Sequence, residues 1–343
     1  MIGKKTLTAM VLAGLMAVQF TAVISAKDVA AASQPAAVTA QNVKAEPQEV
    51  KKAPKLALKI DRVDKDQLPR NFRTTNDQFK GLTKDGILPS REGMSTTRAS
   101  ASSIFSEKEF KQVLKNVPVK PEKFYDIDLR AESHGYINGT AVSWFADHDW
   151  GNDGRTPYIV KHVETDQLNS AKKKGVVKIY QFNDKGNKLM TPIEMQVNSV
   201  RNEEQMVKEH GANYYRIVID DHFRPSDKNM DDFIAFYKTL PKDAWLHFHC
   251  QAGVGRTTAY MAMADMMKNP DVSLKDILQR QHLIGGNYVA YKIPKPKKDQ
   301  WKADYYADKA RMVKLFYTYV QQNYQNNFAT PWSQWLEKHD VVG

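Results

Sequence analysis

The chain has 343 residues, of which 42% are hydrophobic, a composition that excludes a wholly disordered or fibrous protein. Its 50 Lys and Arg against 39 Asp and Glu give a formal charge of +11, so we expect an anionic partner. The chain contains 1 cysteine, which excludes a framework of intramolecular disulfides.

The first 26 residues have the pattern of a secretory signal peptide. Lys4 and Lys5 precede an apolar run that ends near Ile24, and the small residues Ser25 and Ala26 then offer a cleavage site. A membrane anchor is the alternative, but the run is short for a spanning helix. We therefore expect residues 1–26 to be removed and the protein to be secreted, periplasmic or at the cell surface, with no stable membrane anchor.

Residues 27–54 are rich in Ala, Val, Gln and Pro and contain no aromatic residue, which predicts a disordered linker. Aromatic residues and regular hydrophobic patterns continue from there toward the C-terminus, without a second linker or a detectable repeat. The folded part is therefore predicted to be one unit over residues 55–343.

Hydrophobic patterns place strands and helices along this unit. In chain order we expect a strand over Phe124–Leu129, a hairpin over 176–200, a strand over Tyr214–Ile219, a helix over Asn229–Leu240, a strand over Ala244–His249, and helices over Thr257–Lys268 and Ser273–His282. Alternation of strands and helices predicts an α/β fold with a mostly parallel sheet flanked by helices. The hairpin either decorates this domain or belongs to a small β subdomain beside it.

The most specific motif is the loop from His249 to Thr257, in which Cys250 and Arg256 are separated by five residues. Gly253 and Gly255 let the backbone curl so that successive N–H groups point inward, and the predicted helix adds its N-terminal dipole. Such a loop is shaped to hold a phosphate group. Arg256 offers a guanidinium fork to two phosphoryl oxygens.

The same loop predicts a nucleophile. A helix N-terminus and an arginine lower the pKa of a thiol, so Cys250 is expected to attack phosphorus as a thiolate and form a phosphocysteine. We expect His249 to order the loop through hydrogen bonds and Thr257 to stabilise the thiolate as a leaving group. An isolated cysteine is usually a buried apolar residue, but the strand and helix around this loop favour catalysis.

An alkoxide leaving group needs a proton donor near the nucleophile. Asp221 follows the predicted strand that ends at Ile219, and we assign it as the general acid. Asp220 is the competing candidate, and a solvated or capping carboxylate is the alternative for either residue.

Several further motifs accompany the loop. They are Leu68-Pro69-Arg70-Asn71-Phe72-Arg73, Pro89-Ser90-Arg91-Glu92-Gly93, Asp128-Leu129-Arg130-Ala131-Glu132-Ser133-His134-Gly135-Tyr136, Trp245-Leu246-His247-Phe248-His249-Cys250 and Thr330-Pro331-Trp332-Ser333. With these motifs the chain resembles the cysteine phytases, the protein-tyrosine-phosphatase-like inositol polyphosphate phosphatases of anaerobic gut bacteria. The resemblance runs from about Leu68 to Trp335.

The resemblance implies a protein-tyrosine-phosphatase-like central sheet flanked by helices, with a small β-barrel-like subdomain formed roughly by residues 155–200 and part of the N-terminal region. It also implies stepwise hydrolysis of myo-inositol hexakisphosphate through a phosphocysteine, without a metal or another cofactor. By the same match, Asp221 falls on the general acid of the family.

The resemblance also implies a set of substrate-binding residues. Asp149 matches a carboxylate that orients the substrate and the acid loop, and His222 matches a substrate contact. The members of the phosphate loop and of the peripheral phosphate sites are Gln251, Ala252, Gly253, Val254, Gly255, Lys59, Lys188, Lys302, Tyr306 and Lys309. For Lys302 and Lys309 the spacing agrees, because it puts both on one helical face with Tyr306 between them.

Four other functions are alternatives to this one. A tyrosine or dual-specificity phosphoprotein phosphatase would use the same loop, and a binder of inositol phosphates without activity would share the pocket. Loss of Cys250, Arg256 or Asp221 would mark such a binder, and all three are present. Nucleic-acid binding and a metal-dependent phosphatase are disfavoured, since no nucleic-acid module and no histidine and carboxylate pattern at ligand spacing appears.

Overall fold

The computed structural model describes residues 56–182, 189, 190, 192–290 and 297–339. All of these belong to the compact unit from Ala53 to Gly343. The predicted signal peptide and linker lie outside the described residues. Within the described part of the chain, no helix is both long and apolar enough to cross a membrane.

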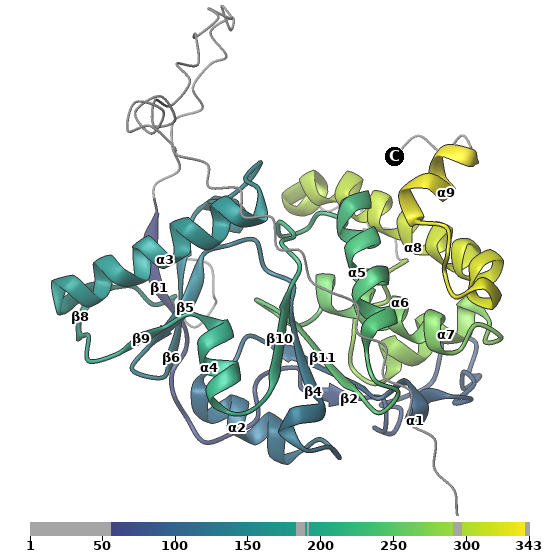
Figure 1. Cartoon of the computed structure of the whole chain (residues 1–343), viewed down its shortest axis with the longest axis horizontal. Helices are drawn as coiled ribbons and strands as arrows, with labels where there is room; N and C mark the ends of the chain where they lie inside the picture. The colour runs from purple at the N-terminus through teal and green to yellow at the C-terminus, as the bar shows by residue number, and fades with distance from the viewer. Residues whose placement is uncertain (1–55, 183–188, 191, 291–296, 340–343) are drawn as a thin grey trace, which may run out of the picture. The chain divides into compact units, whose positions relative to one another are not determined.

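A five-stranded sheet forms the centre of the unit (Figure 1). Its strands, in spatial order, are β10 (Asn213–Arg216), β4 (Phe124–Asp128), β11 (Trp245–Cys250), β3 (Ala99–Ser103) and β2 (Arg73–Thr74). The first four are parallel, and β2 runs antiparallel to β3. The prediction of a mostly parallel sheet is confirmed. Because β11 lies at the centre, its C-terminal end places Cys250 at the middle of one sheet edge.

Helices from the C-terminal half cover one face of this sheet (Figure 1). They are α5 (Asp227–Thr239), α6 (Gly255–Lys268), α7 (Leu274–Leu283), α8 (Ala303–Asn323) and α9 (Trp332–Lys338), with the short α1 (Met94–Thr97) beside them. Helix α6 is buried along nearly its whole length, and its methionines and Tyr260 pack with Phe248 of β11. This burial fixes the N-terminus of α6 directly behind the cysteine loop.

The opposite face of the sheet is covered by α2 (Glu107–Lys115) and α4 (Glu203–Glu209). Ser106 begins α2 with a capping box, since its hydroxyl accepts from the Glu109 N–H and the Glu109 carboxylate accepts from the Ser106 N–H. Alternate residues of β11, such as Trp245, turn their side chains to this face. His249 is buried on it as well, whereas Cys250 belongs to the other core.

A second, antiparallel sheet carries the remaining strands in the order β1, β6, β5, β9. Their bounds are Ala57–Arg62 for β1, His134–Ile137 for β5, Thr140–Phe145 for β6 and Val200–Arg201 for β9. A separate hairpin of β7 (Val176–Ile179) and β8 (Ile193–Gln196) joins β1 through a bridge between Lys59 and Tyr180. Short 3-10 helices occur at Pro121–Lys123, Asp147–Asp149, Lys297–Lys302 and Tyr324–Asn326.

The segment from residue 155 to residue 200, predicted to form a small β subdomain with part of the N-terminal region, also contains a helix. Residues Pro157–Lys174 form the helix α3, because Thr156 caps it, Pro157 begins it and Gly175 ends it in the left-handed conformation. The antiparallel sheet also contains β5 and β6, which precede residue 155, and β1 from the N-terminal region. Among the described residues, the four-stranded sheet and the two-stranded hairpin are linked at the bridge between Lys59 and Tyr180. The predicted hairpin is confirmed by β7 and β8.

Candidate active site

Cys250 is the last residue of β11, and the loop after it leads directly into α6. Its Sγ atom accepts a hydrogen bond from the Gly253 N–H at 3.3 Å and another from the Thr257 hydroxyl at 3.1 Å. The thiol is 2% exposed. The structure therefore agrees with the role expected for Thr257, whose hydroxyl is placed to stabilise negative charge on sulfur.

The pKa of the Cys250 thiol is the balance of opposing effects. Burial raises the pKa, because a thiolate loses solvation in the protein interior. The charge of Arg256 and the hydrogen bonds from Thr257 and Gly253 outweigh burial, although the nearby Asp221 opposes them. The net pKa lies below the ordinary value of a cysteine, as expected for a nucleophilic thiolate.

The loop is curled by one glycine and held from outside by two side chains. Gly253 has φ of 74°, and a Cβ atom there would lie 2.3 Å from the backbone of Ser102 and Ser103. The carbonyl oxygens of Ala252 and Gly253 accept hydrogen bonds from Asn71 and Arg73 at 2.8 Å each. With these carbonyls held outward, the loop N–H groups are left to face an anion.

Sequence reasoning missed Asn71 and Arg73 as parts of this site. Arg73 is completely buried, and its guanidinium also donates to the Thr258 hydroxyl at 3.0 Å. Burial lowers the pKa of Arg73 to about 10, and the neighbouring Cys250 acts in the opposite direction. Both residues lie in the Leu68 to Arg73 motif, which was the available signal.

Arg256 is fixed by a buried carboxylate, Glu132. Its Nη1 and Nη2 atoms donate to the two carboxylate oxygens of Glu132 at 3.0 and 3.2 Å, and Nη1 also donates to the Leu129 and Ile219 carbonyls. The Nε atom of Arg256 is buried and has no hydrogen-bond partner among the described residues. A bound phosphate would therefore accept hydrogen bonds from Nε and Nη2 of Arg256. Glu132 would continue to hold the guanidinium group in place.

Glu132 was not singled out in the sequence, although it lies in the Asp128 to Tyr136 motif. Burial alone would raise its pKa, but Arg256 and Arg130 lower the pKa far below the usual range of a glutamate. Glu132 therefore stays ionised. Its negative charge in turn raises the pKa of Arg256.

Asp221 lies across the site from Cys250. Its Oδ1 is 3.3 Å from Arg256 Nη2, its Oδ2 is 3.2 Å from His222 Nε2, and its side chain is 30% exposed. It lines the cavity above the loop. Asp220, the competing candidate, is not among the residues lining that cavity. Burial raises the pKa of Asp220 to about 6, but a general acid must first reach the leaving oxygen. The geometry favours Asp221.

The acid loop is attached to its neighbours by Trp150, another residue that sequence reasoning missed. The Trp150 Nε1–H donates to the Asp221 carbonyl at 2.9 Å, and its ring packs edge-on against Phe223 at 5.4 Å. On the other side, His222 Nδ1 lies 3.1 Å from the Tyr306 hydroxyl. Burial and the charges of Lys302 and Lys309 lower the pKa of His222 to about 4, although Asp221 opposes them.

Asp149, next to Trp150, occupies a strained position at the cavity. Asp149 has φ of 60° and His148 has φ of 56°, in the left-handed region that ordinary residues rarely adopt. Burial raises the pKa of Asp149 to about 7, and the nearby Lys59 acts against this rise. Its buried Oδ1 has no hydrogen-bond partner among the described residues. The side chain is thus available to a substrate hydroxyl or phosphate.

A cavity of about 630 Å³ opens between the cysteine loop and strand β1. Its lining residues include Lys59, Asp149, Asp221, His222 and Gln251, all predicted to bind substrate or act in catalysis. Lys59 is only 2% exposed, and its Nζ lies 2.6 Å from Asp61. Its ammonium charge is therefore already paired within the protein. Gln251 donates to the same carboxylate at 2.9 Å and so connects the loop with β1.

Two predicted cations, Lys309 of α8 and Lys302 just before it, are not among the residues that line this cavity. Lys309 is 3% exposed, and its Nζ lies 5.1 Å from the centre of the Tyr306 ring. The same Nζ would be 3.9 Å from a Cβ atom built on Gly255, which places it beside the cysteine loop. Lys302 precedes α8 and acts on His222 together with Lys309. Lys188 lies outside the described residues, so its role remains a prediction.

The side chain of His249 was expected to form hydrogen bonds with the loop, but in the structure it forms an ion pair with Glu203. Side chains alternate along a strand, so the imidazole of His249 and the thiol of Cys250 point to opposite faces of the sheet. His249 Nε2 lies 2.6 Å from the Glu203 carboxylate on α4. His249 can therefore act on the loop only through the strand that carries both residues.

Comparisons with known proteins identify relatives of this chain. The family model of the PTP-like phytases, described as "Inositol hexakisphosphate", matches residues 127–268. The PTP-like myo-inositol phosphatase of Mitsuokella multacida, solved with myo-inositol-(1,3,4,5)-tetrakisphosphate, is 55% identical with a TM-score of 0.81. That match covers 86% of this chain and 49% of the other. A PTP-like phytase of Bdellovibrio bacteriovorus is 31% identical with a TM-score of 0.65, covering 83% of this chain and 97% of the other.

A curated relative also matches most of this chain. The effector protein hopD2 of Pseudomonas syringae pv. tomato is 28% identical over 275 residues, which are 78% of this chain and 56% of the relative. The chain thus spans about half the length of both the Mitsuokella and the Pseudomonas proteins.

Proposed function

Because the chain belongs to the PTP-like phytase family, we propose that it hydrolyses phosphate monoesters of inositol polyphosphates, with Cys250 as the nucleophile. The observation that carries the proposal is the geometry around Cys250. A thiol of lowered pKa accepts two hydrogen bonds inside a curled loop, beside a buried arginine whose Nε is unpaired among the described residues. Loop N–H groups and Arg256 together are suited to the charge that develops on phosphoryl oxygens.

In the first step, the Cys250 thiolate forms a bond to phosphorus as the bond from phosphorus to the inositol oxygen breaks. Asp221, in its protonated form, gives its proton to the departing oxygen, which leaves as a hydroxyl group. Asp221 is paired with Arg256 in the structure. An incoming phosphate would take the place of Asp221 at Arg256.

In the second step, water attacks the phosphocysteine and the bond between sulfur and phosphorus breaks. The Asp221 carboxylate takes the proton from the water and is thereby ready for the next cycle. The Thr257 hydroxyl and the Gly253 N–H stabilise the returning thiolate. Inorganic phosphate is the second product, so the overall reaction consumes one water for each monoester.

Several features support an inositol polyphosphate as the substrate. The cavity of about 630 Å³ is larger than a single phosphate needs, and it lies between the acid loop and β1. Lys302 and Lys309 add positive charge on the α8 side. The Mitsuokella relative was solved with an inositol tetrakisphosphate, a compound of this class. We take myo-inositol hexakisphosphate as the substrate that is hydrolysed stepwise.

The covalent intermediate provides the test of this mechanism. Rapid acid quenching of the chain during turnover of myo-inositol hexakisphosphate should leave phosphate attached to Cys250, detected by peptide mass spectrometry. Omission of substrate serves as the control. Turnover with no modified Cys250 peptide at any quench time would contradict the covalent mechanism, whereas no turnover at all would contradict the proposed substrate.

Lys309 gives a prediction about pH. Burial, with help from Arg256, lowers the pKa of Lys309 to about 8, so its positive charge is present below this pH and is lost above it. We expect the KM for inositol polyphosphate to rise as the pH passes through about 8. A charge-assisted hydrogen bond is worth about 1.5–3 kcal/mol, so Lys309→Met should raise KM roughly tenfold to a hundredfold at neutral pH.

Measurement of KM between pH 6 and pH 9 checks this prediction, with Lys314→Met as the matched control. Lys314 lies on the same helix but is exposed. An unchanged KM in Lys309→Met, or a KM that still rises near pH 8 in that variant, would show that another group binds the phosphate.

We also propose that the protein is exported after cleavage near Ala26. The support is the pattern of two lysines, an apolar run and small residues at the N-terminus. N-terminal sequencing of protein recovered from the secreting host should give a chain that starts near Lys27. An intact Met1 on protein retained in the cell would argue against export.

A further inference from the structure

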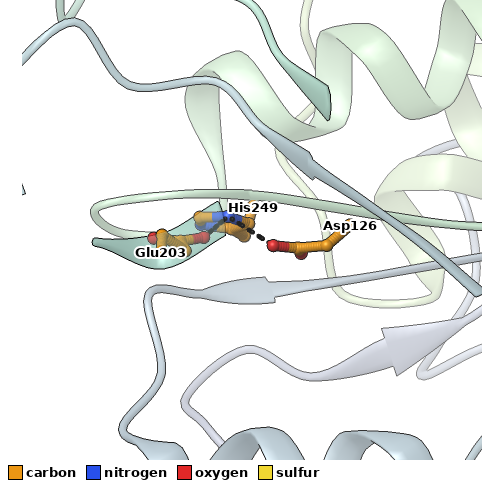
Figure 2. A group of neighbouring side chains, drawn as sticks. All are labelled: Asp126, Glu203 and His249. Atoms are coloured by element: carbon orange, nitrogen blue, oxygen red, sulfur yellow. Dashed lines mark ion pairs between the residues drawn. The ribbon is translucent and has the colours of Figure 1, made fainter. Parts of the chain in front are cut away.

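A layer of buried charged residues lies behind the cysteine loop, on the face of the central sheet opposite Cys250. Asp126 from β4, Glu203 from α4 and His249 from β11 meet there (Figure 2). Their side chains are at most 1% exposed. Charges buried to this degree are costly unless they are paired, so the arrangement requires an explanation.

Glu203 connects two histidines that belong to different sheets. Its Oε1 lies 2.6 Å from His249 Nε2, on the strand that ends in Cys250, and its Oε2 lies 3.1 Å from His134 Nε2 in β5 of the second sheet. The His134 Nδ1 atom lies 2.7 Å from the carbonyl oxygen of Glu132. Glu132 in turn holds Arg256. Cys250 is joined to His249 by the backbone of β11. From His249, side-chain contacts run through Glu203, His134 and Glu132 to Arg256, which belongs to the same loop as Cys250.

The distances favour an ion pair over a shared metal ion. Two ligand atoms about 2.1 Å from one ion and at right angles to each other lie about 3.0 Å apart. The separation of 2.6 Å between His249 Nε2 and Glu203 Oε1 is shorter than this and is that of a close ion pair. Asp126 Oδ2 lies farther off, at 3.6 Å from the same nitrogen.

The charges in the cluster balance without an added ion. Burial lowers the pKa of His249, but Glu203 and Asp126 outweigh this and keep it well above the usual range, although His247 beside it is a further basic group. Burial raises the pKa of Asp126 to about 8. Burial raises the pKa of Glu203, but His249 lowers it to about 2, so an ionised Glu203 lies beside a protonated His249. Asp128, which also faces this cluster, pairs with His134 and Arg216.

We propose that Glu203 is a positioning residue of the phosphatase reaction, which holds the strand of Cys250 in register with the segment that carries Glu132. This inference rests on the proposed role of Cys250 as the nucleophile. Glu203 touches neither the thiol nor the cavity. It acts by fixing His249 and His134, and through them the relative positions of the attacking sulfur and of Arg256.

The expected effect appears in turnover more than in binding. A misplacement of about 1 Å in a catalytic group costs about a hundredfold in rate, so Glu203→Gln should lower kcat roughly tenfold to a hundredfold. The cavity and Lys309 are untouched by the substitution, so KM should change little. Without its carboxylate partner, the buried His249 imidazole should lose its extra proton near neutral pH.

Two variants serve as controls in the full chain. Glu204→Gln removes the neighbouring carboxylate on the same helix, which is partly exposed and pairs with Lys161 and Lys208, and should leave kcat unchanged. Asp126→Asn removes the more distant of the two acids, at 3.6 Å from His249, and should lower kcat less than Glu203→Gln does. Nitrogen-15 NMR of labelled histidines, assigned with His249→Gln, reports the protonation of His249 without any substrate.

We expect wild-type His249 to carry a proton on both ring nitrogens at pH 8. In Glu203→Gln, His249 should lose one of these protons at a lower pH than in the wild-type protein. A neutral His249 in the wild-type protein at pH 7 would overturn the proposal, and this measurement stands even if Glu203→Gln does not fold. A kcat of Glu203→Gln equal to that of Glu204→Gln would also overturn it. A stoichiometric divalent metal in the purified protein, with Asp126→Asn and Glu203→Gln equally impaired, would establish a metal site instead. The NMR results are independent of which phosphate ester the enzyme prefers.

Discussion

Replacing Cys250 by serine is expected to abolish hydrolysis of inositol polyphosphates, with a fall in kcat of at least about 10⁴-fold. The thiol of Cys250 has a lowered pKa because of Arg256, Thr257 and Gly253, and these groups stabilise a thiolate. A serine hydroxyl in the same place remains protonated and is a much weaker nucleophile than a thiolate. The phosphate-binding groups are unchanged, so the variant should still bind substrate.

Two measurements separate loss of chemistry from loss of structure. Phosphate release gives the residual rate, and calorimetric titration with myo-inositol hexakisphosphate gives the affinity of Cys250→Ser. Because the chain has 1 cysteine, alkylation with iodoacetamide modifies a single site, and activity should fall in proportion to labelling. A serine variant or a fully alkylated protein that retains more than a few per cent of the wild-type rate would exclude Cys250 as the nucleophile.

Replacing Asp221 by asparagine is expected to lower kcat for inositol polyphosphate by about 10²- to 10⁴-fold, the usual contribution of a general acid. The amide cannot give a proton to the departing inositol oxygen. With p-nitrophenyl phosphate the loss should be much smaller, because nitrophenolate is a stable anion that leaves without protonation. The ratio of the two losses identifies the role of the residue, which a single rate cannot do.

Asp220→Asn is the matched control, since Asp220 is the adjacent carboxylate and does not line the cavity. It should keep the ratio of activities on the two substrates at the wild-type value. If Asp221→Asn lowered kcat equally on both substrates, Asp221 would not be the general acid. It would then only orient Arg256, with which it is paired at 3.3 Å. A selective loss on inositol phosphate in Asp220→Asn would transfer the acid role to Asp220.

The strand, loop and helix around Cys250 could be predicted because each follows a local rule. The apolar run predicted over Ala244–His249 became β11 at Trp245–Cys250, and the helix predicted from Thr257 begins at Gly255 and ends at Lys268 as expected. Glycine, arginine and threonine at fixed offsets then identify the phosphate-binding loop. These features depend on neighbours in sequence, which a single chain displays.

Strand β3 was missed because its sequence, Ala-Ser-Ala-Ser-Ser, lacks the branched and aromatic residues typical of strands. The structure explains the small side chains. The hydroxyls of Ser100 and Ser102 contact the two ring nitrogens of His247 at 2.9 and 3.0 Å. The backbone of Ser102 also lies so close to residue 253 that only glycine, which has no Cβ atom, fits there. The small residues of β3 are therefore explained by close packing against the cysteine loop, and not by the strand preference of the residues themselves.

The supporting residues of the site were missed for a different reason. Arg73, Glu132 and Glu203 are buried charges, and in a sequence such residues are ordinarily taken as surface positions. Their partners are far away along the chain, as in the pairing of Glu132 with Arg256. Only the folded structure reveals that these charges are paired, and the motifs that contain Arg73 and Glu132 were the nearest available signal.

The most direct test of the proposed function compares two substrates with the unmodified chain. The kcat/KM for phosphate release from myo-inositol hexakisphosphate is measured beside that for a phosphotyrosine peptide, both in the presence of EDTA. We predict rapid, chelator-resistant release from the inositol phosphate and a lower kcat/KM for the peptide. A higher kcat/KM for the peptide, or no release from the inositol phosphate, would contradict the assignment of this protein as an inositol polyphosphate phosphatase.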